Sequence, residues 1–390
     1  MSYEFYNPTR VLFEAGQLNH LHEQKMPGKK AMLVISNGKS TRASGALDRT
    51  MKELSLAGVE VVLFDKVGAN PVKEIVEEGG HFAKKEGCDF IVALGGGSVM
   101  DAAKVMAMYA QQPGDLWDYV AGATGKQQPL VNPVLPVIAI TTTAGTGSEV
   151  DQWGVVTNPA TNEKIGCGGM DELFPVIAVV DPELMLTVPP KFTAYQGFDA
   201  LFHSVEGYLS VVSSPMSEMV QLAAIENIGT YLPRVVKDGS DLEAREHVAF
   251  ANTMSGYSMV VGSCTSEHSM EHAMSAFHPA LPHGAGLIMI SVEYYRHFIE
   301  KHCCDERFVR MAQALGMKDA KAPEDFITAL KKLQEDCGVS DLKMSDYGIE
   351  KEESMVLARN AKATMGGLFA CDPVPMTDEE CAAIYEKSYR

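Results

Sequence analysis

The first half of the chain alternates short apolar runs with stretches of helical character, and this alternation is the strongest constraint on its fold. The runs are bounded by Gly, Asn or Asp, as buried strands often are. The predicted strands are residues 31–35, 59–64, 90–94, 137–140 and 176–180. The predicted helices lie near residues 43–56, 72–87 and 98–110. This order is typical of β-α-β units, and it predicts a Rossmann-like α/β domain with a buried parallel sheet.

The second half of the chain differs, because strand-like runs become rare after Val188. Long amphipathic stretches rich in Ala, Met, Glu and Leu continue to the C-terminus, which predicts an all-helical region. Pro189 and Pro190 separate the two halves, and proline can neither continue a helix nor donate to a sheet. A chain of 390 residues is also too long for one ordinary core. We therefore predict an α/β domain over residues 1–188 and an all-helical domain over residues 189–390.

Composition narrows the class of partner. An apolar content of 46% and a charged content of 22% are typical of a soluble globular protein. The net charge of -18 argues against a nucleic acid partner, which needs a basic face. No apolar run is long enough to cross a membrane, and the N-terminal segment does not resemble a signal peptide. The eight cysteines form no C-x-x-C pair, so we expect reduced thiols in a cytoplasmic protein.

Carboxylate and imidazole side chains gather in three short segments of the helical half. Asp199 and His203 are four residues apart in a predicted helix, so both side chains leave one face of it. His268 and His272 repeat that spacing, and His283 stands at a break marked by Pro and Gly. Imidazole and carboxylate suit iron, zinc, cobalt or nickel, so the group predicts a transition-metal site. Taken singly, each segment has a plainer explanation, such as a surface salt bridge or a turn.

A glycine-rich turn follows the predicted strand at residues 90–94 and opens the next predicted helix. Its glycines are Gly95, Gly96 and Gly97. Glycine lets the backbone approach an anion and a helix N-terminus supplies free N–H groups, so we interpret the turn as a pyrophosphate cradle. Ser98 is expected to be the N-cap, with Asp101 at the capping-box position. A tight turn without a ligand is the alternative.

A second loop, residues 141–149, is rich in hydroxyls and glycines and also follows a predicted strand. The carboxyl ends of parallel strands meet at the ligand crevice of an open α/β sheet. Two such loops on neighbouring strands suit a dinucleotide better than a single phosphate. A structural Ser/Thr turn is the alternative.

Taken together and in this order, these segments resemble the iron-containing (group III) alcohol dehydrogenases. The shared motifs are residues 94–98, 141–149, 197–208, 268–272 and 282–284, and the resemblance covers essentially the whole chain. It implies the two-domain architecture that group III alcohol dehydrogenases share with dehydroquinate synthases. It also implies hydride transfer between a nicotinamide and an alcohol or aldehyde in a cleft between the domains.

The resemblance further implies a role for each residue of the metal cluster. Asp199, His203, His268 and His283 match the metal ligands, whereas His272 matches a histidine that stays off the metal and carries a proton. The ion is expected to act as a Lewis acid toward the substrate oxygen. Iron(II) is the expected metal, and zinc is possible at the same donors.

Cofactor contacts are expected from the two loops, from the turn after the first predicted strand and from one lysine. These residues are Gly38, Ser40, Gly95, Gly96, Gly97, Ser98, Asp101, Thr141, Thr142, Thr146, Ser148 and Lys164. Relatives that prefer NAD(H) tend to carry an Asp after the first strand, whereas residues 36–42 lack a carboxylate and include Lys39 and Arg42. We therefore expect NADP(H) to be favoured over NAD(H), unless both cations are merely solvated.

The leading functional prediction is an NAD(P)-dependent alcohol dehydrogenase or aldehyde reductase (EC 1.1.1.-) for a small primary alcohol or aldehyde. It is expected to form a homo-oligomer, a dimer or larger. One alternative is a dehydroquinate-synthase-like or glycerol-dehydrogenase-like enzyme that also uses a metal and NAD. Another is a binding protein that kept the nucleotide fold. The substrate pocket is expected near residues 151–153, Cys264 and Phe277.

Overall fold

The computed structural model describes residues 3–390 and divides into two compact units. One unit comprises residues 6–161 and 165–187, and the other comprises residues 188–390 with residues 3–5 and 162–164. Met1 and Ser2, with which the predicted first domain and the N-terminal segment begin, lie outside the described residues. The compact units are thus discontinuous in sequence, and a domain boundary at residues 188/189 stays a prediction.

The first unit is built on a parallel sheet of six strands in the order β1-β8-β5-β4-β2-β3. Its strands are β1 (Arg10–Phe13), β2 (Lys30–Ser36), β3 (Glu60–Val67), β4 (Phe90–Gly95), β5 (Val137–Thr141) and β8 (Ile177–Val180). Two further strands, β6 (Trp153–Asn158) and β7 (Glu163–Gly168), form a separate small sheet. The parallel sheet and the helical second half confirm the predicted fold class, although β1, β6 and β7 were not predicted.

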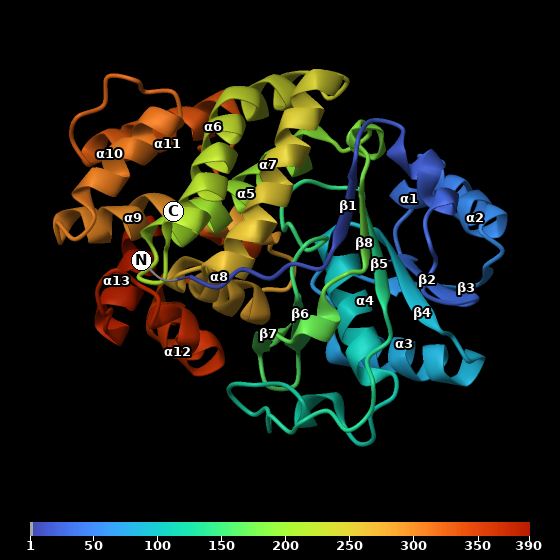
Figure 1. Ribbon diagram of the computed structural model, residues 1–390. Helices are drawn as coiled ribbons and strands as arrows, with labels where there is room; N and C mark the ends of the chain where they lie inside the picture. The colour runs from blue at the N-terminus through green and yellow to red at the C-terminus, as the bar shows by residue number, and fades with distance from the viewer. Residues whose placement is uncertain (1–2) are drawn as a thin grey trace. The chain divides into compact units, whose positions relative to one another are not determined.

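Helices cover both faces of the six-stranded sheet (Figure 1). Successive residues of a strand point to opposite faces. In β2, Met32 and Val34 join the apolar core formed with α3 (Lys73–Glu86) and α4 (Gly97–Tyr109). Ala31 and Leu33 join the core on the other face, with η1 (Gln17–Glu23) and α2 (Ala46–Leu56). Because both faces are covered, the strands read as continuous apolar runs, which is why they were predictable.

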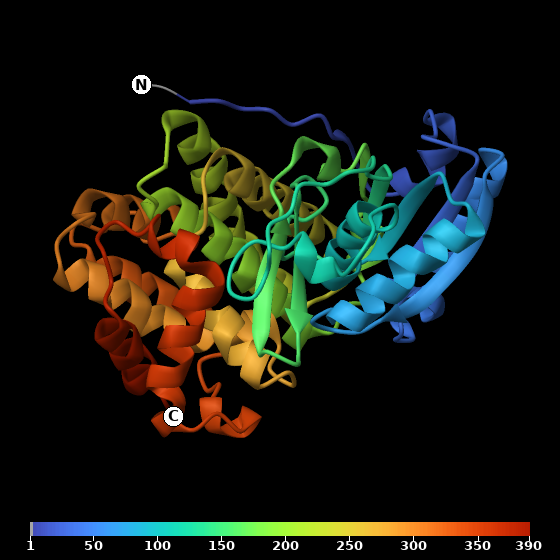
Figure 2. The same ribbon diagram turned by 90° about the horizontal axis from the view of Figure 1, so that it is seen from below.

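The second unit is helical. Its α-helices are α5 (Pro190–Leu209), α6 (Pro215–Lys237), α7 (Leu242–Val261), α8 (Ser266–Phe277), α9 (His283–Glu300), α10 (Asp305–Ala314), α11 (Glu324–Asp336), α12 (Ser354–Phe369) and α13 (Asp378–Ser388). The last two lie side by side in both views (Figures 1 and 2). Short helical turns complete the chain: α1 (Ser40–Ala43), η2 (Leu116–Asp118), η3 (Asp171–Leu173), η4 (Pro182–Met185), η5 (Met344–Tyr347) and η6 (Lys351–Glu353). Within residues 3–390, none of the helices has both the length and the apolar character that a membrane span requires.

Helix α8 is unusual because it is buried although most of its side chains are polar. Every residue from Ser266 through Ala276 is buried. The polar ones among them are Ser266, Glu267, His268, Ser269, Glu271, His272 and Ser275. Buried polar groups destabilise a fold unless they find partners, so such a helix indicates a site rather than a core element.

A buried ion pair joins α4 to the loop that follows β5. Lys104 of α4 is completely buried, and its Nζ donates to Asp151 Oδ1 at 2.7 Å. It also donates to the carbonyl oxygens of Ser148 at 2.9 Å and of Asp151 at 3.2 Å. One turn earlier, Asp101 accepts from Ser148 Oγ at 2.6 Å and from the backbone N–H of Val155 at 3.0 Å. These contacts hold the end of the second loop against the helix that begins at the first.

We predict that Lys104→Met destabilises the protein by about 3–5 kcal/mol, because it leaves the buried Asp151 carboxylate without its cation. The free energy of unfolding from urea denaturation measures the effect. In Lys104→Met/Asp151→Asn the orphaned charge is gone, so stability should partly return. A double variant as unstable as the single one would show that packing of the lysine stem, not the charge, is responsible.

Candidate metal centre and nucleotide cradle

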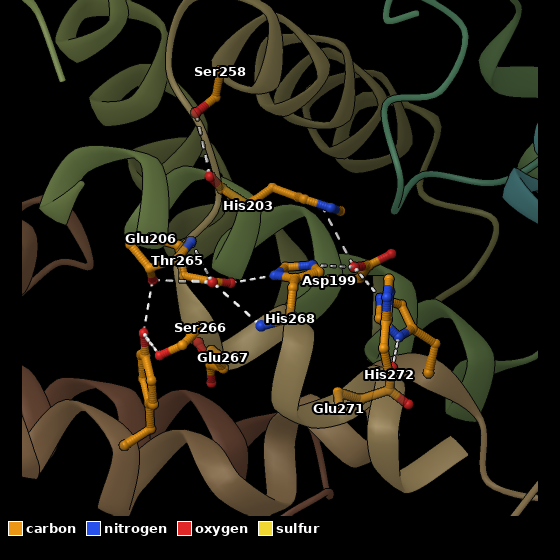
Figure 3. Close-up of polar contacts among 12 residues, drawn as sticks. Asp199, His203, Glu206, Ser258, Thr265, Ser266, Glu267, His268, Glu271 and His272 are labelled. Atoms are coloured by element: carbon orange, nitrogen blue, oxygen red, sulfur yellow. Dashed lines mark hydrogen bonds and ion pairs between the residues drawn. The ribbon is translucent and has the colours of Figure 1, made fainter. Parts of the chain in front are cut away.

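Three imidazole rings converge on one carboxylate oxygen, and Figure 3 shows two of them, His203 and His268, beside Asp199. Oδ1 of Asp199, on α5, lies 3.5 Å from Nδ1 of His203 and 3.5 Å from Nε2 of His268. It lies 3.4 Å from Nε2 of His283. Asp199 is only 4% exposed. The structure thus brings together the four residues that the sequence predicted as metal ligands.

The spacing of these donors fits a single ion. Donors at about 2.1 Å from a tetrahedral ion lie about 3.4 Å from one another, and the three distances from Asp199 Oδ1 to the imidazole nitrogens match this value. Asp199 Oδ1 and His268 Nε2 are buried and have no hydrogen-bond partner among the described residues. Donor atoms of Asp199, His268 and His283 all lie within 4.8 Å of one another. The residues present therefore fit a divalent metal ion.

Glu206 holds His268 from the side opposite Asp199 (Figure 3). It lies two turns after Asp199 on α5, is fully buried, and one of its oxygens contacts His268 Nδ1. Its other oxygen accepts from the backbone N–H groups of Thr265 at 2.9 Å and His268 at 3.3 Å, at the N-terminus of α8. Burial lowers the pKa of His268, but the charge of Glu206 together with the effects of Cys264 and Asp199 outweighs it and raises that pKa well above its usual value. A carboxylate in this position fixes the ring and leaves Nε2 for a metal.

Glu271 fixes the ring of His283 in the same way as Glu206 fixes that of His268. Its Oε2 contacts His283 Nδ1 and lies 3.3 Å from Nζ of Lys164. Burial raises the pKa of Glu271, but His283 and Lys164 outweigh it and bring that pKa below its usual value. Lys164, predicted to contact the cofactor, also donates to Ser275 Oγ at 2.8 Å.

Gly284 allows α9 to begin close to α5. A side chain at this position would lie 2.1 Å from the carbonyl oxygen of Tyr195 on α5.

The electrostatics of Asp199 follow from the same cluster. Burial alone raises the pKa of this carboxyl. The positive charges of His203 and His283 and the nearby ring nitrogens of His268 and His283 oppose burial, and they hold the pKa of Asp199 well below its usual range. The group is therefore an anion ready to bind a cation.

His272 differs from its neighbours because, among the described residues, no carboxylate is hydrogen-bonded to its ring. It is 4% exposed, and its Nδ1 lies 2.9 Å from the sulfur of Met365, at an irregular residue within α12. Burial lowers the pKa of His272 well below its usual value, and the charges of Lys164, His283 and His268 lower it further. Donor atoms of His272, Glu271 and His283 lie within 4.8 Å of one another, so His272 borders the centre.

Sequence reasoning missed the carboxylates behind the histidines. Glu206 and Glu271 are acidic residues in helices, like many others, and only their burial singles them out. The spacing from Asp199 to Glu206 is a weak signal, because residues seven apart share a helix face. His278, which is near the motif but was not assigned to the metal, contacts Glu353 at 3.0 Å instead.

The glycine-rich turn after β4 faces the second loop. A side chain on Gly97 would lie 2.2 Å from Cγ2 of Thr146, and one on Gly96 would lie 2.9 Å from the side chain of Thr143. Neither glycine is required by its backbone angle, since Gly96 has a φ of -83°. Glycine is needed here because the two loops approach each other closely.

The prediction that Ser98 is the N-cap of this helix is wrong. Helix α4 starts at Gly97 with Gly96 as its N-cap, and none of the described side chains forms a capping hydrogen bond there. The extended conformation of Gly96 already turns the chain into the helix, so Ser98 falls inside the first turn. Asp101 forms no capping box, because Ser148 and Val155 take its two oxygens.

Other predicted cofactor residues make contacts within the loops. Oγ1 of Thr141 donates to the carbonyl of Thr143 at 2.8 Å, and the N–H of Thr142 donates to the carbonyl of Gly95 at 2.9 Å. Thr146 Oγ1 accepts from the N–H of Ser148 at 3.2 Å. These contacts bring the ends of β4 and β5 together, since the two strands are neighbours in the sheet.

The turn after β2 contains Gly38 and, at the start of α1, Ser40. Sequence reasoning found no carboxylate within residues 36–42, but the fold brings one from the next strand. Asp65 of β3 accepts from Nη2 of Arg42 at 2.7 Å, with both side chains partly exposed. β3 pairs with β2, which is why a residue distant in sequence arrives at this turn.

The chain matches known iron-containing alcohol dehydrogenases in sequence. Residues 8–182 match the family model described as iron-containing alcohol dehydrogenase, and residues 193–389 match the Fe-containing alcohol dehydrogenase family, C-terminal. The chain is 38% identical over 324 residues to choline dehydrogenase of Bacillus subtilis (strain 168), covering 80% of this chain and 77% of that one. It is 33% identical over 371 residues to 1,3-propanediol dehydrogenase of Klebsiella pneumoniae, covering 94% and 93%.

Solved structures agree with these matches. An archaeal halo-thermophilic alcohol dehydrogenase from a Red Sea brine pool aligns over 100% of both chains, with a TM-score of 0.93 and 34% identity. The structure of a 1,3-propanediol oxidoreductase also aligns over 100% of both, with a TM-score of 0.90 and 31% identity. The resemblance found in the sequence is thereby confirmed. The chain belongs to the iron-containing alcohol dehydrogenase family.

Proposed function

We propose that this protein is a metal-dependent alcohol dehydrogenase or aldehyde reductase for a small primary alcohol or aldehyde. The observation that carries the proposal is the convergence of three imidazole nitrogens on one buried carboxylate oxygen. The names of relatives support the substrate class, since they include choline, 1,3-propanediol, methanol and butanol dehydrogenases. The family implies a metal and a nicotinamide nucleotide.

The proposed metal ligands are Asp199, His203, His268 and His283, and the proposed metal is iron(II), with zinc possible at the same donors. When bound, the metal supplies Lewis acidity toward the substrate oxygen, and the nicotinamide exchanges a hydride with the carbon that bears it. Glu206 and Glu271 orient two of the rings and direct their Nε2 atoms inward.

His272 is the proposed catalytic residue. Its pKa lies well below the usual value because of burial and nearby positive charge, so the imidazole is neutral at physiological pH. A neutral imidazole can accept the proton that an alcohol loses on oxidation, and return it on reduction of an aldehyde. The turn at Gly95–Ser98 and the loop around Thr146 are proposed to hold the nucleotide, and a contact from Lys164 stays a prediction from the sequence.

The experiment that tests this function is an assay of purified protein, reconstituted with iron(II) under argon, for oxidation of NADPH or NADH with butyraldehyde. We predict turnover that a chelator abolishes and iron(II) restores. His268→Ala should lose both metal and activity. His272→Ala should retain metal but turn over about 10²–10⁴-fold more slowly, as expected for loss of a general acid or base.

Metal content, measured on the same samples, separates the two roles. If His272→Ala lost the metal and His268→Ala kept it, the assignments of the two histidines would be exchanged. If the metal-free protein turned over at the full rate, the metal proposal would fail.

The proposed nucleotide cradle predicts that Gly97→Val weakens dinucleotide binding about tenfold or more. The new side chain meets Thr146 and pushes the two loops apart. A titration of NADPH fluorescence measures the dissociation constant. Metal content should not change, since the four proposed ligands belong to the other compact unit. Unchanged nucleotide affinity would place the cradle elsewhere.

We also propose a preference for NADP(H). Arg42 and Asp65 neutralise one another, which leaves Lys39 as the net cation beside Gly38 and Ser40. The ratio of kcat/KM with NADPH to that with NADH should exceed one, and Lys39→Ala should lower it. A ratio below one in the parent protein contradicts the proposal, and Asp65 would then be the residue that selects NAD(H).

A cytoplasmic location and a homo-oligomeric state, a dimer or larger, stay predictions from the sequence.

A further inference from the structure

Cys264 lies beside two of the proposed metal ligands. It is in the short segment between α7 and α8 and is 8% exposed. One donor atom each of His203, Cys264 and His268 lie within 4.8 Å of one another. This group shares His268 with the Asp199, His268 and His283 group but adds Cys264, and the mechanism proposed above gives the thiol no part.

One nitrogen of His268 belongs to this group, and its Nε2 also lies 3.5 Å from Asp199 Oδ1. Its Nδ1 is held by Glu206, so Nε2 is the nitrogen left for a metal, and Nε2 is buried without a hydrogen-bond partner among the described residues. The rings of His203 and His268 are stacked, with centroids 4.2 Å apart and planes at 29°. Their edges therefore lie side by side, and Cys264 supplies a third donor.

The two donor groups differ in chemical softness. A carboxylate with imidazoles suits iron(II), whereas a thiolate with imidazoles favours zinc and other thiophilic ions. We propose that His203, Cys264 and His268 form a second metal site, which takes a thiophilic divalent ion such as zinc or cadmium. On binding, the sulfur–metal bond forms and the thiol proton passes to solvent, so the ion gains one anionic ligand without any change of oxidation state.

The geometry requires only small movements. Zinc binds sulfur at about 2.3 Å and imidazole nitrogen at about 2.0–2.1 Å, so three donors within 4.8 Å move together by about 1 Å. Three protein ligands leave a fourth position for water, as in open zinc sites.

The second site excludes the first, because both need His203 and His268. A thiophilic ion at Cys264 thus competes with the iron that the proposed function requires. This competition rests on the proposed function, whereas binding of the ion at Cys264 does not.

Cadmium titration of the full-length protein, stripped of metal under reducing conditions, tests the site. Thiolate–cadmium charge transfer gives a near-ultraviolet band, and we expect it to grow to one equivalent in the parent protein. Cys264→Ser should lose the band. Cys337→Ser is the matched control, a buried cysteine of the same unit outside every described donor group, and it should keep the band.

Asp199→Ala and His283→Ala separate the two sites, because they remove only the proposed iron ligands. Both should keep the band. A band that persists in Cys264→Ser, or that disappears in both of these variants, overturns the proposal.

Competition is measured as iron released when zinc is added to iron-loaded protein. Cys264→Ser should need about tenfold more zinc or higher, since loss of a ligand costs at least as much as loss of a supporting residue. Equal zinc sensitivity in both proteins would refute the competition. A cadmium band lost only in Cys264→Ser, in an iron-loaded protein that oxidises neither NADPH nor NADH with an aldehyde, would support the site while removing the proposed function.

Discussion

The helical unit depends on one buried carboxylate. Asp199 has three imidazoles around a single oxygen, and two of those rings are backed by further buried carboxylates. Positive and negative groups therefore alternate outward from Asp199, which is how charges can be buried at all. The arrangement also fixes the helices, because α5, α8 and α9 each contribute residues to it. Glu206 illustrates the coupling: it orients His268 and also binds the N-terminal backbone of α8.

The α/β unit also buries polar groups, at the carboxyl ends of β4 and β5. Lys104 and Asp101, both on α4, take up the polar groups of the second loop, so that loop is held without exposing them to water. The absence of side chains at Gly96 and Gly97 gives the two loops room to meet. The buried contacts of Lys104 and Asp101 thus help to position the loops that are proposed to hold the nucleotide.

Much of the fold could be read from the sequence, and the failures have physical causes. The central strands are covered on both faces and form long apolar runs, whereas β1 has four residues and is half-exposed. Ser98 looked like a cap because of its residue type, but Gly96 already makes the turn. Asp65 was not predicted to lie at the turn after β2, because it belongs to the neighbouring strand β3. The charges of residues 36–42 alone do not include it.

The sequence by itself determined which residues face the same way. Four-residue spacings on predicted helices predicted that Asp199 and His203, and likewise His268 and His272, project from single faces. Only the tertiary structure decided what each face meets. Glu206 and Glu271 select the free nitrogen of two histidines, His272 contacts the sulfur of Met365, and Cys264 lies beside the cluster. Helix periodicity is a local property, whereas the partners of a buried group depend on how distant helices pack.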